Sequence, residues 1–468
     1  MATIAEAGAR PVPAADSTPR FSRAYLGWLL GLLVAIYASS FLDRVIISTV
    51  GPAIISDLRI SDTQFGLLTG PAFAVFYVVL GIPIARLAER SSRVNIISIC
   101  IALWSLMTAL CGMASSYAPL LIFRMGVGVG EGGCSPAAHS LLSDHFPPRR
   151  RATALAVYFA GVPFGVMIGA VLGGWLAAAF NWRVAFMVLG LPGVLLALLA
   201  KLTLREPPRG HVDGAAPPAD APSLAAVFKR LMKNPTVVLL VCGLVSANFG
   251  GSAMAAFTQT YLVRAFHLSL AAVGLLYGLV VGTAGIFGMT MGGVIADIAG
   301  KKDIRWYAWA PALGCAVGFP IYIAAFTQAT ALASVGFIFL GYLVVTFYFA
   351  PTFAVVQNLV EPRMRATASS LLFLAINMMG QALGPVVIGL VSDLIARHAF
   401  TLGNYRALCP PHPHAAAGIV AACARASSYG LQHSILLMCG CYLLGAAFYL
   451  LASRTLKRDL QFRDPQGS

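Results

Sequence analysis

Residues 184–200 read VAFMVLGLPGVLLALLA, a run that contains no charged side chain. A helix that crosses the hydrocarbon core of a bilayer needs about 20 mainly apolar residues. Comparable runs occur twelve times along the 468-residue chain, at approximately residues 25–50, 64–85, 94–113, 117–141, 152–179, 183–203, 235–262, 270–296, 306–326, 331–357, 366–392 and 430–453. Transmembrane β-strands are about 9–11 residues long, so these lengths exclude a β-barrel. The sequence therefore predicts an all-α polytopic membrane protein with twelve transmembrane helices.

The composition leads to the same class of protein. Hydrophobic residues make up 59% of the chain and charged residues 10%, and the mean hydropathy is +0.81. Soluble domains contain roughly 25% charged residues, so a soluble globule could not cover this much apolar surface. The same values exclude a disordered chain, a collagen-like repeat, a coiled coil and a disulfide-rich secreted scaffold.

The net charge of +15 comes from an excess of Lys and Arg, and most of these residues lie on one side of the predicted spans. With the N-terminus in the cytoplasm, 24 of these residues fall in the tails and cytoplasmic loops and 6 on the opposite side. This is the bias that the positive-inside rule describes. The polar residues 1–23 lack the short apolar core of a cleavable signal peptide. We expect an inner (plasma) membrane protein with both termini cytoplasmic and no nucleic-acid partner.

The chain divides into two halves of six spans. Residues 204–234 contain five prolines and have the composition of a cytoplasmic linker between residues 1–203 and 235–468. Arg151-Ala152-Thr153-Ala154 opens the fifth span, and Arg365-Ala366-Thr367-Ala368 opens the eleventh, 214 residues later. Such a repeat predicts two six-helix bundles related by a pseudo-two-fold axis. Repeated halves are frequent in secondary transporters, with the substrate site between them.

The motif Gly293-x-x-Ala296-Asp297-x-x-Gly300-Lys301-Lys302, between the eighth and ninth spans, resembles the loop signature of the major facilitator superfamily. A second copy lies between the second and third spans, with Ala85, Glu89 and Ser92 where the family has Gly, Asp and Gly. The fifth span is similar to the family's glycine-rich fifth helix, with Gly161, Gly165, Gly169, Gly173 and Gly174. The resemblance covers essentially the whole chain and implies a transporter that works by alternating access.

Three segments resemble the spinster-like branch of this family. They are Phe41-Leu42-Asp43-Arg44 in the first span, Gly66-Leu67-Leu68 at the start of the second, and Arg124-Met125-Gly126-Val127-Gly128-Val129-Gly130-Glu131, followed by Pro136, in the fourth. Animal spinster proteins move lysophospholipids and sphingosine phosphate. The resemblance therefore implies a bacterial homologue that transports a lipid-like amphipath.

Four charged residues fall well inside the predicted spans: Asp43, Arg44, Arg124 and Glu131. A charge at the bilayer centre costs about 2.5–3.5 kcal/mol on insertion scales, so such residues face a cavity or a partner. Asp43 and Arg124 should lie at similar depth on helices that line the cavity of this family, which predicts a cluster of Asp43, Arg124 and Glu131. Arg124 and Glu131 are seven residues apart, about 10 Å along one helix, so a shared partner is expected.

These residues predict proton coupling. Burial raises and a nearby arginine lowers the pKa of a carboxyl group, so opening and closing a cavity can load and release a proton. Asp43 and Glu131 are the predicted titrating pair, and Arg124 is the predicted switchable partner or the anchor of an anionic head group. Arg44 either pairs with neighbours of Asp43 or extends toward the interface. The alternative is a static ion network that holds helices together.

The loop motifs predict a cytoplasmic gate made by Glu89, Arg90, Arg151, Asp297, Lys301 and Arg365. Acidic groups at these helix ends can pair across the loops when the inner side is closed. The alternative is that the basic residues only follow the positive-inside rule. On the other side, Cys409 and Cys423 lie in a predicted extracytoplasmic connection at about 393–429, a compartment that permits a disulfide between them.

The function predicted from these features is proton-coupled secondary transport of a lipid-like amphipath. A proton-coupled transporter of a small organic anion is the alternative within transporters, and a channel or a non-transporting receptor is the alternative outside them. An enzyme is not expected, because no nucleophile, base and acid set or metal-ligand spacing occurs in the spans. We expect no metal and no cofactor, and a monomer in the bilayer.

Overall fold

The computed structural model describes residues 21–208, 224–361, 364–409 and 416–461, and these residues form helices without strands. The first half contains α1 (Arg23–Thr49), α2 (Gly51–Leu58), α3 (Asp62–Thr69), α4 (Pro71–Arg90), α5 (Arg93–Cys111), α6 (Tyr117–Gly132), α7 (Cys134–His145), α8 (Pro148–Phe159), α9 (Gly161–Ala179) and α10 (Trp182–Thr203). After α11 (Leu224–Met232), the second half contains α12 (Pro235–Phe266), α13 (Leu270–Gly300), α14 (Trp306–Phe326), α15 (Ala331–Val345), η1 (Thr346–Tyr348), α16 (Phe349–Asn358), α17 (Arg365–Ala375), η3 (Ile376–Ala382), α18 (Gly384–Ala399), α19 (Tyr405–Leu408) and α20 (Ala417–Gln461).

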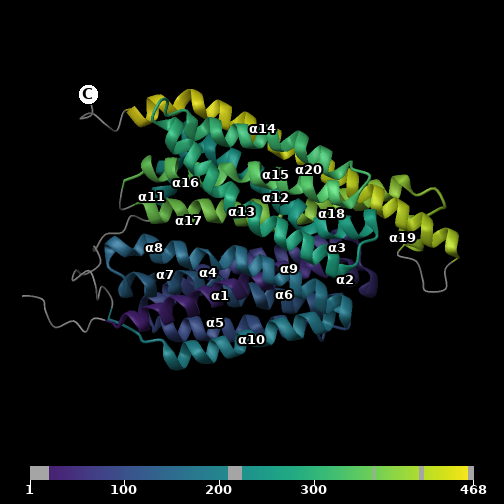
Figure 1. Cartoon of the computed structure of the whole chain (residues 1–468), viewed down its shortest axis with the longest axis horizontal. Coiled ribbons are helices and arrows are strands. Elements are labelled where there is room, and N and C mark those ends of the chain that lie inside the picture. Colours follow the sequence, from purple (N-terminus) through teal and green to yellow (C-terminus); the bar gives the residue numbers. More distant parts are fainter. Residues whose placement is uncertain (1–20, 209–223, 362–363, 410–415, 462–468) are drawn as a thin grey trace, which may run out of the picture.

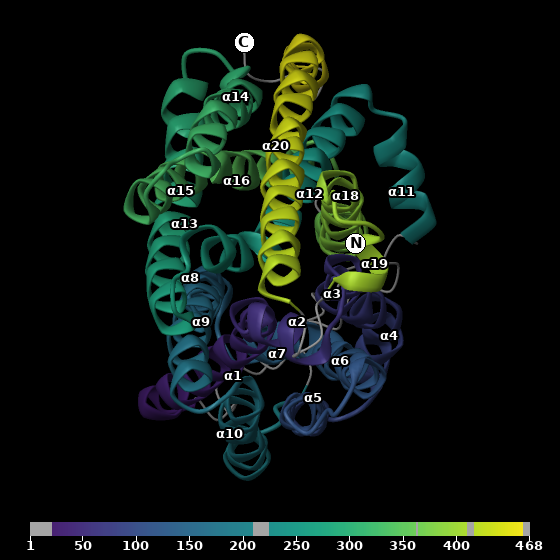
Figure 2. The ribbon, with the colours of Figure 1, turned by 90° about the vertical axis from the view of Figure 1, so that its right-hand side faces the viewer.

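The helices form two bundles, one for each half of the chain. Figure 1 shows α1–α10 together in one bundle and α12–α20 in the other, with the start of α1 and the end of α20 at the same end of the molecule. We call this end the termini side and the opposite end, with α2 and α19, the loop side (Figure 2). Across the bundles, α9 packs along α13 and α3 packs against α18.

Within the described residues, eleven helical segments are long and apolar enough to cross a membrane. The remaining predicted span is the fourth, residues 117–141; it is formed by α6 and α7, which meet at Gly133, and it contains the charged residues Arg124 and Glu131. Gly133 has no side chain, and the Ile84 side chain occupies the place that a β-carbon would need. With this broken span counted, the structure has the twelve transmembrane helices that the sequence predicts.

The structure adds detail to two predicted connections. The linker at 204–234 contains α11, whose Leu-Ala-Ala start favours a helix and follows the last proline. Residues 209–223 lie outside the described part of the chain. The predicted loop at about 393–429 is also shorter, since α18 continues to Ala399 and α20 begins at Ala417. The segment 417–426 contains five alanines, which favour a helix, and it continues directly into the predicted twelfth span.

Cys409 and Cys423 form a disulfide that joins the end of α19 to the first turns of α20, with a Cα–Cα distance of 5.7 Å. Phe400 and Ala426 pack around this bridge. We expect intact-mass analysis after alkylation to show modification of both cysteines only after reduction. Cys242, which is half-buried and free, is the internal control for reagent access. Alkylation of both residues in the unreduced protein would contradict the bridge.

Candidate functional site

Glu131 is bound by two side chains from α1. Its Oε2 accepts a hydrogen bond of 2.6 Å from the Ser40 hydroxyl and one of 2.8 Å from Arg44 Nε. The side chain of Glu131 is 1% exposed and that of Arg44 15%, so the ion pair lies inside the protein. Ser40 and Arg44 are four residues apart, which places them on one face of α1. That face meets the glycine-rich end of α6, where Glu131 lies.

Aromatic rings surround the guanidinium of Arg44. Its Cζ lies 4.7 Å from the ring centroid of Phe73 and 4.8 Å from those of Phe41 and Tyr77. Cations within about 6 Å of a ring centroid are attracted by the ring's negative face. The rings therefore stabilise the arginine charge without neutralising it, while Glu131 provides the counter-ion.

Asp43 is buried beside this pair and lacks a hydrogen-bond partner. The residue is 1% exposed, and neither carboxylate oxygen accepts a hydrogen bond from any described residue. Arg124, also 1% exposed, donates from Nη1 to the backbone carbonyl of Asp43 at 3.1 Å, and its guanidinium lies 5.3 Å from the Phe73 centroid. A buried carboxylate that accepts no hydrogen bonds is costly, and the neutral carboxylic acid avoids this cost.

The structure changes the predicted pairing of the four charges. Arg124 does approach Asp43, but through its carbonyl oxygen and not its carboxylate. Glu131 is paired with Arg44, whereas the sequence predicted a cluster with Arg124 and gave Arg44 other partners. Two features of the helices explain the difference. Arg44 follows Ser40 by about one turn and faces α6, and Glu131 lies about two turns beyond Arg124 on α6.

A second charged cluster, which the sequence analysis missed, joins the two bundles on the loop side. Arg264 at the end of α12 binds both carboxylate oxygens of Asp62 at the start of α3, at 2.7 and 2.8 Å. Ser392 of α18 donates to the same carboxylate at 2.7 Å. Asp393 of α18 accepts from the backbone N–H groups of Asp62 and Thr63 at 3.2 and 2.9 Å, and from the Thr63 hydroxyl at 2.6 Å.

We call Asp62, Thr63, Arg264, Ser392 and Asp393 the loop-side latch. Asp62 and Asp393 are each 5% exposed. Asp393 satisfies two free N–H groups at the N-terminus of α3, where an acidic group is stabilised by the helix dipole. Arg264 and Asp393 belong to one bundle and Asp62 to the other, so the halves cannot separate here unless these bonds break. The only sequence signal was the Ser61-x-x-Gln64 capping box that begins α3.

The predicted gate residues lie on the termini side, where Arg151, Asp297 and Arg365 form hydrogen bonds with residues of their own bundle. Arg151 donates to the carbonyls of Ser143 and Phe146, and Arg365 to that of Gln357. Asp297 accepts a 2.6 Å hydrogen bond from Tyr307. The side chains of Arg90 and Lys301 are exposed. The side chain of Glu89 lies outside the described part of the structure.

The first part of the linker is attached to the termini side by Arg93, which is fully buried. Arg93 forms ion pairs with Asp144 of α7 and, at 2.6 Å, with Glu206. Partial burial raises the pKa of Glu206, but the N–H of Val94 and the side chains of Arg93 and Ser92 outweigh this effect and lower it. This contact was not predicted from the sequence.

Comparison with known proteins supports the assignment of the fold. Residues 33–385 match the Major Facilitator Superfamily. An MFS-type efflux pump of Mycolicibacterium smegmatis is 32% identical over 92% of this chain and 93% of its own length. Protein spinster homolog 1 of Homo sapiens is 28% identical over 81% of this chain and 76% of its own length.

Solved structures give the same result. A bacterial homologue of the human lysosomal transporter spinster, in an inward-facing and unoccupied conformation, superposes with a TM-score of 0.84 at 33% identity, covering 94% of this chain and 99% of that one. The nucleoside transporter NupG, at 14% identity and a TM-score of 0.62 over 90% of this chain and 98% of that one, shares the fold. The chain described here is therefore a spinster-like membrane transporter of the major facilitator superfamily.

Proposed function

We propose that this transporter is proton-coupled, works by alternating access and carries a lipid-like amphipath such as a lysophospholipid or a sphingoid. The observation that supports coupling most directly is the unpartnered carboxyl group of Asp43 beside the buried Arg44–Glu131 pair. A proton on Asp43 removes a costly buried charge. A proton on Glu131 frees Arg44, because a neutral carboxyl group no longer balances the guanidinium.

Alternating access is supported by the loop-side latch. Asp62 and Thr63 of one bundle are bonded to Arg264, Ser392 and Asp393 of the other, which is the arrangement expected when the loop side is closed. An open loop side requires these bonds to break and a second set to form on the termini side. We infer that Glu89, Arg90, Arg151, Asp297, Lys301 and Arg365 contribute to that second set, with the termini side in the cytoplasm of the inner membrane.

The substrate class is supported by the site and by the relatives. Arg124 has a buried Nε without a hydrogen-bond partner among the described residues, so it can bind an anionic head group. The aromatic rings around Arg44 offer apolar surface next to it. Spinster homologues and an efflux pump are similar over most of the chain. The same free Arg124 Nε also favours the second candidate, a small organic anion that moves with protons.

Proton movement in proteoliposomes tests the proposal. Lysophospholipids, sphingoids and small organic anions are supplied in turn to wild type, Asp43→Asn and Glu131→Gln. We expect one substrate class to drive proton flux in wild type and both variants to lose it, because each has lost a titratable group and kept the side-chain shape. Asp57→Asn is the matched control, since Asp57 lies on α2 outside the spans. Equal substrate flux in all four proteins would show that the carboxylates are structural.

A further inference from the structure

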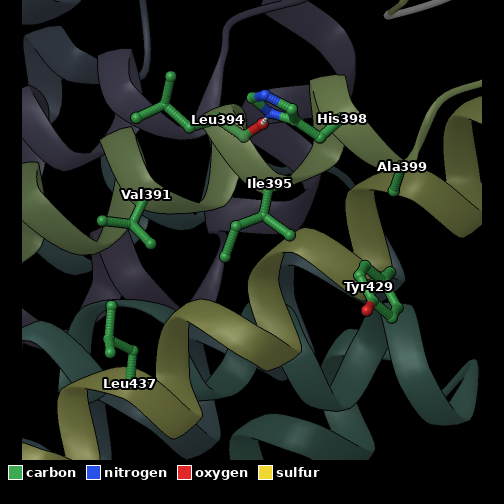
Figure 3. A pocket seen from close by; sticks show the side chains of 7 residues that line it. All are labelled: Val391, Leu394, Ile395, His398, Ala399, Tyr429 and Leu437. Carbon is green, nitrogen blue, oxygen red and sulfur yellow. Dashed lines mark hydrogen bonds between the residues drawn. The ribbon is translucent and has the colours of Figure 1, made fainter.

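A groove runs between α18 and α20 on the loop-side half of the second bundle. Figure 3 shows the side chains of Val391, Ile395 and Leu437 toward one end of the groove, with His398 and Tyr429 toward the other end. The groove contains about 730 Å³ and is largely open at the protein surface. Leu437 is 59% exposed and Tyr429 is 49% exposed, so one side of the groove is open at the protein surface.

A second hollow continues the groove toward the end of the helices. It shares Ala399 and Tyr429 with the first and adds Phe400, Thr401 and Arg425. We call the two hollows together the α18–α20 groove. The end of the groove near Leu437 is lined by aliphatic side chains. The opposite end is lined by a histidine, a tyrosine, a threonine and an arginine. The groove is therefore amphipathic along its length.

The polar end of the groove is positively charged and has no acidic partner. Arg425 forms no ion pair among the described residues, and the same is true of Arg397 on α18 and Arg406 on α19. By contrast, two other arginines on the same side do form ion pairs: Arg183 of α10 pairs with Asp57, and Arg264 of α12 pairs with Asp62. An unbalanced arginine group at a lipid-water boundary attracts anionic head groups.

The length of the groove matches one leaflet. Arg425 and Leu437 are twelve residues apart on α20, about 18 Å along the helix. The hydrocarbon core of a bilayer is about 30 Å thick, so one leaflet contributes about 15 Å. Tyr429 lies between the two ends, four residues from Arg425, and aromatic side chains are frequent at the head-group boundary. A phosphate at Arg425 thus places an acyl chain against Leu437.

We propose that the α18–α20 groove binds one anionic phospholipid from the loop-side leaflet. The phosphate group contacts Arg425 and His398, and an acyl chain lies along Val391, Leu394, Ile395 and Leu437. This site is separate from Asp43, Arg44 and Glu131, and it holds whether or not the transporter moves protons. An anionic lipid here would bridge the ends of α18 and α20, next to the α18 residues of the loop-side latch.

Native mass spectrometry of the purified full chain tests the site. The probes are phosphatidylglycerol and phosphatidylcholine with identical acyl chains, and inorganic phosphate as competitor. We expect wild type to retain one phosphatidylglycerol preferentially, and Arg425→Gln to weaken this binding about tenfold, the scale of one charged hydrogen bond. Arg425→Lys, which keeps the charge, should retain most of it. Arg183→Gln is the matched control, because it removes an arginine from the same side but from the other bundle.

A second variant tests the apolar end without changing any charge. Leu394→Trp fills the groove and should weaken binding of phosphatidylglycerol while Arg425 is intact. Equal binding of both lipids, or an unchanged affinity in Arg425→Gln, would overturn the proposal. Displacement by millimolar phosphate would show a free-anion site and also overturn it. A dimer that Leu394→Trp converts to a monomer, measured by light scattering, would assign the groove to a second copy of this chain instead.

Discussion

Replacing Arg44 by methionine should destabilise the fold by about 3–5 kcal/mol, because the substitution leaves the Glu131 carboxylate buried without its counter-ion. Glu131→Gln should cost less than Arg44→Met, since glutamine still accepts the hydrogen bond from Ser40. The double variant Arg44→Met/Glu131→Gln removes both charges. We expect it to be more stable than Arg44→Met alone, because replacing a complete buried ion pair is often close to neutral.

Chemical unfolding in a fixed detergent measures this double-mutant cycle. The coupling free energy is the difference between the effect of the double substitution and the sum of the single ones. Additive effects would contradict a direct Arg44–Glu131 interaction. Transport gives an independent readout, since the double variant should fold well and still lack proton-coupled flux. Stability and coupling are thereby separated in one set of proteins.

Arg264→Gln should open the loop side. Removing one partner of a hydrogen-bonded charge pair at an interface costs about 2–5 kcal/mol, and here the pair joins the two bundles. Hydrogen exchange at the start of α3 reports the change directly, because the N–H groups of Asp62 and Thr63 are bonded to Asp393 of the other bundle. Exchange there should accelerate by about thirtyfold or more, since 1.4 kcal/mol corresponds to a factor of ten.

Arg183→Gln is the matched control for the latch. Arg183 and Asp57 form a pair on the same side of the molecule, but both residues belong to the first bundle, and their side chains are 34% and 46% exposed. Partial burial raises the pKa of Asp57, but hydrogen bonds from Arg183 and Trp182 outweigh it and keep that pKa below its usual value. Exposed pairs contribute about 0–1 kcal/mol, so exchange in α3 should remain close to wild type. Equal acceleration in both variants would show that the latch does not join the bundles.

The spans and the family could be predicted because their signals are local. Each apolar run is long enough to identify a helix without knowledge of its neighbours, and the motif at 293–302 is continuous. The interruptions of the second span at Gly70 and of the fourth at Gly133 were not predicted, because these glycines pack closely against Ala382 and Ile84 of other helices. The disulfide partners lie 14 residues apart in one connection, so topology alone was enough to suggest their pairing.

The charged residues of the site were also identified from the sequence, because a charge inside an apolar run needs no alignment or partner to be noticed. Their pairing depends on how α1 rotates against α6, and this rotation is set by packing along both helices. The tertiary structure therefore decided that Glu131 binds Arg44 and that the Asp43 carboxylate accepts no hydrogen bond from the described residues.

The loop-side latch also consists of residues whose partners could not be predicted from the sequence, and these partners lie further apart in the chain. Asp62, Arg264 and Asp393 each lie at the end of a span, where charged residues are ordinary, so nothing in the sequence marks them as partners. Arg264 lies 202 residues from Asp62, and Asp393 lies 331 residues from it. The sequence by itself determined which segments cross the membrane, because that depends on local hydrophobicity. Only the tertiary structure decided which charges meet, because that depends on how the two bundles face each other.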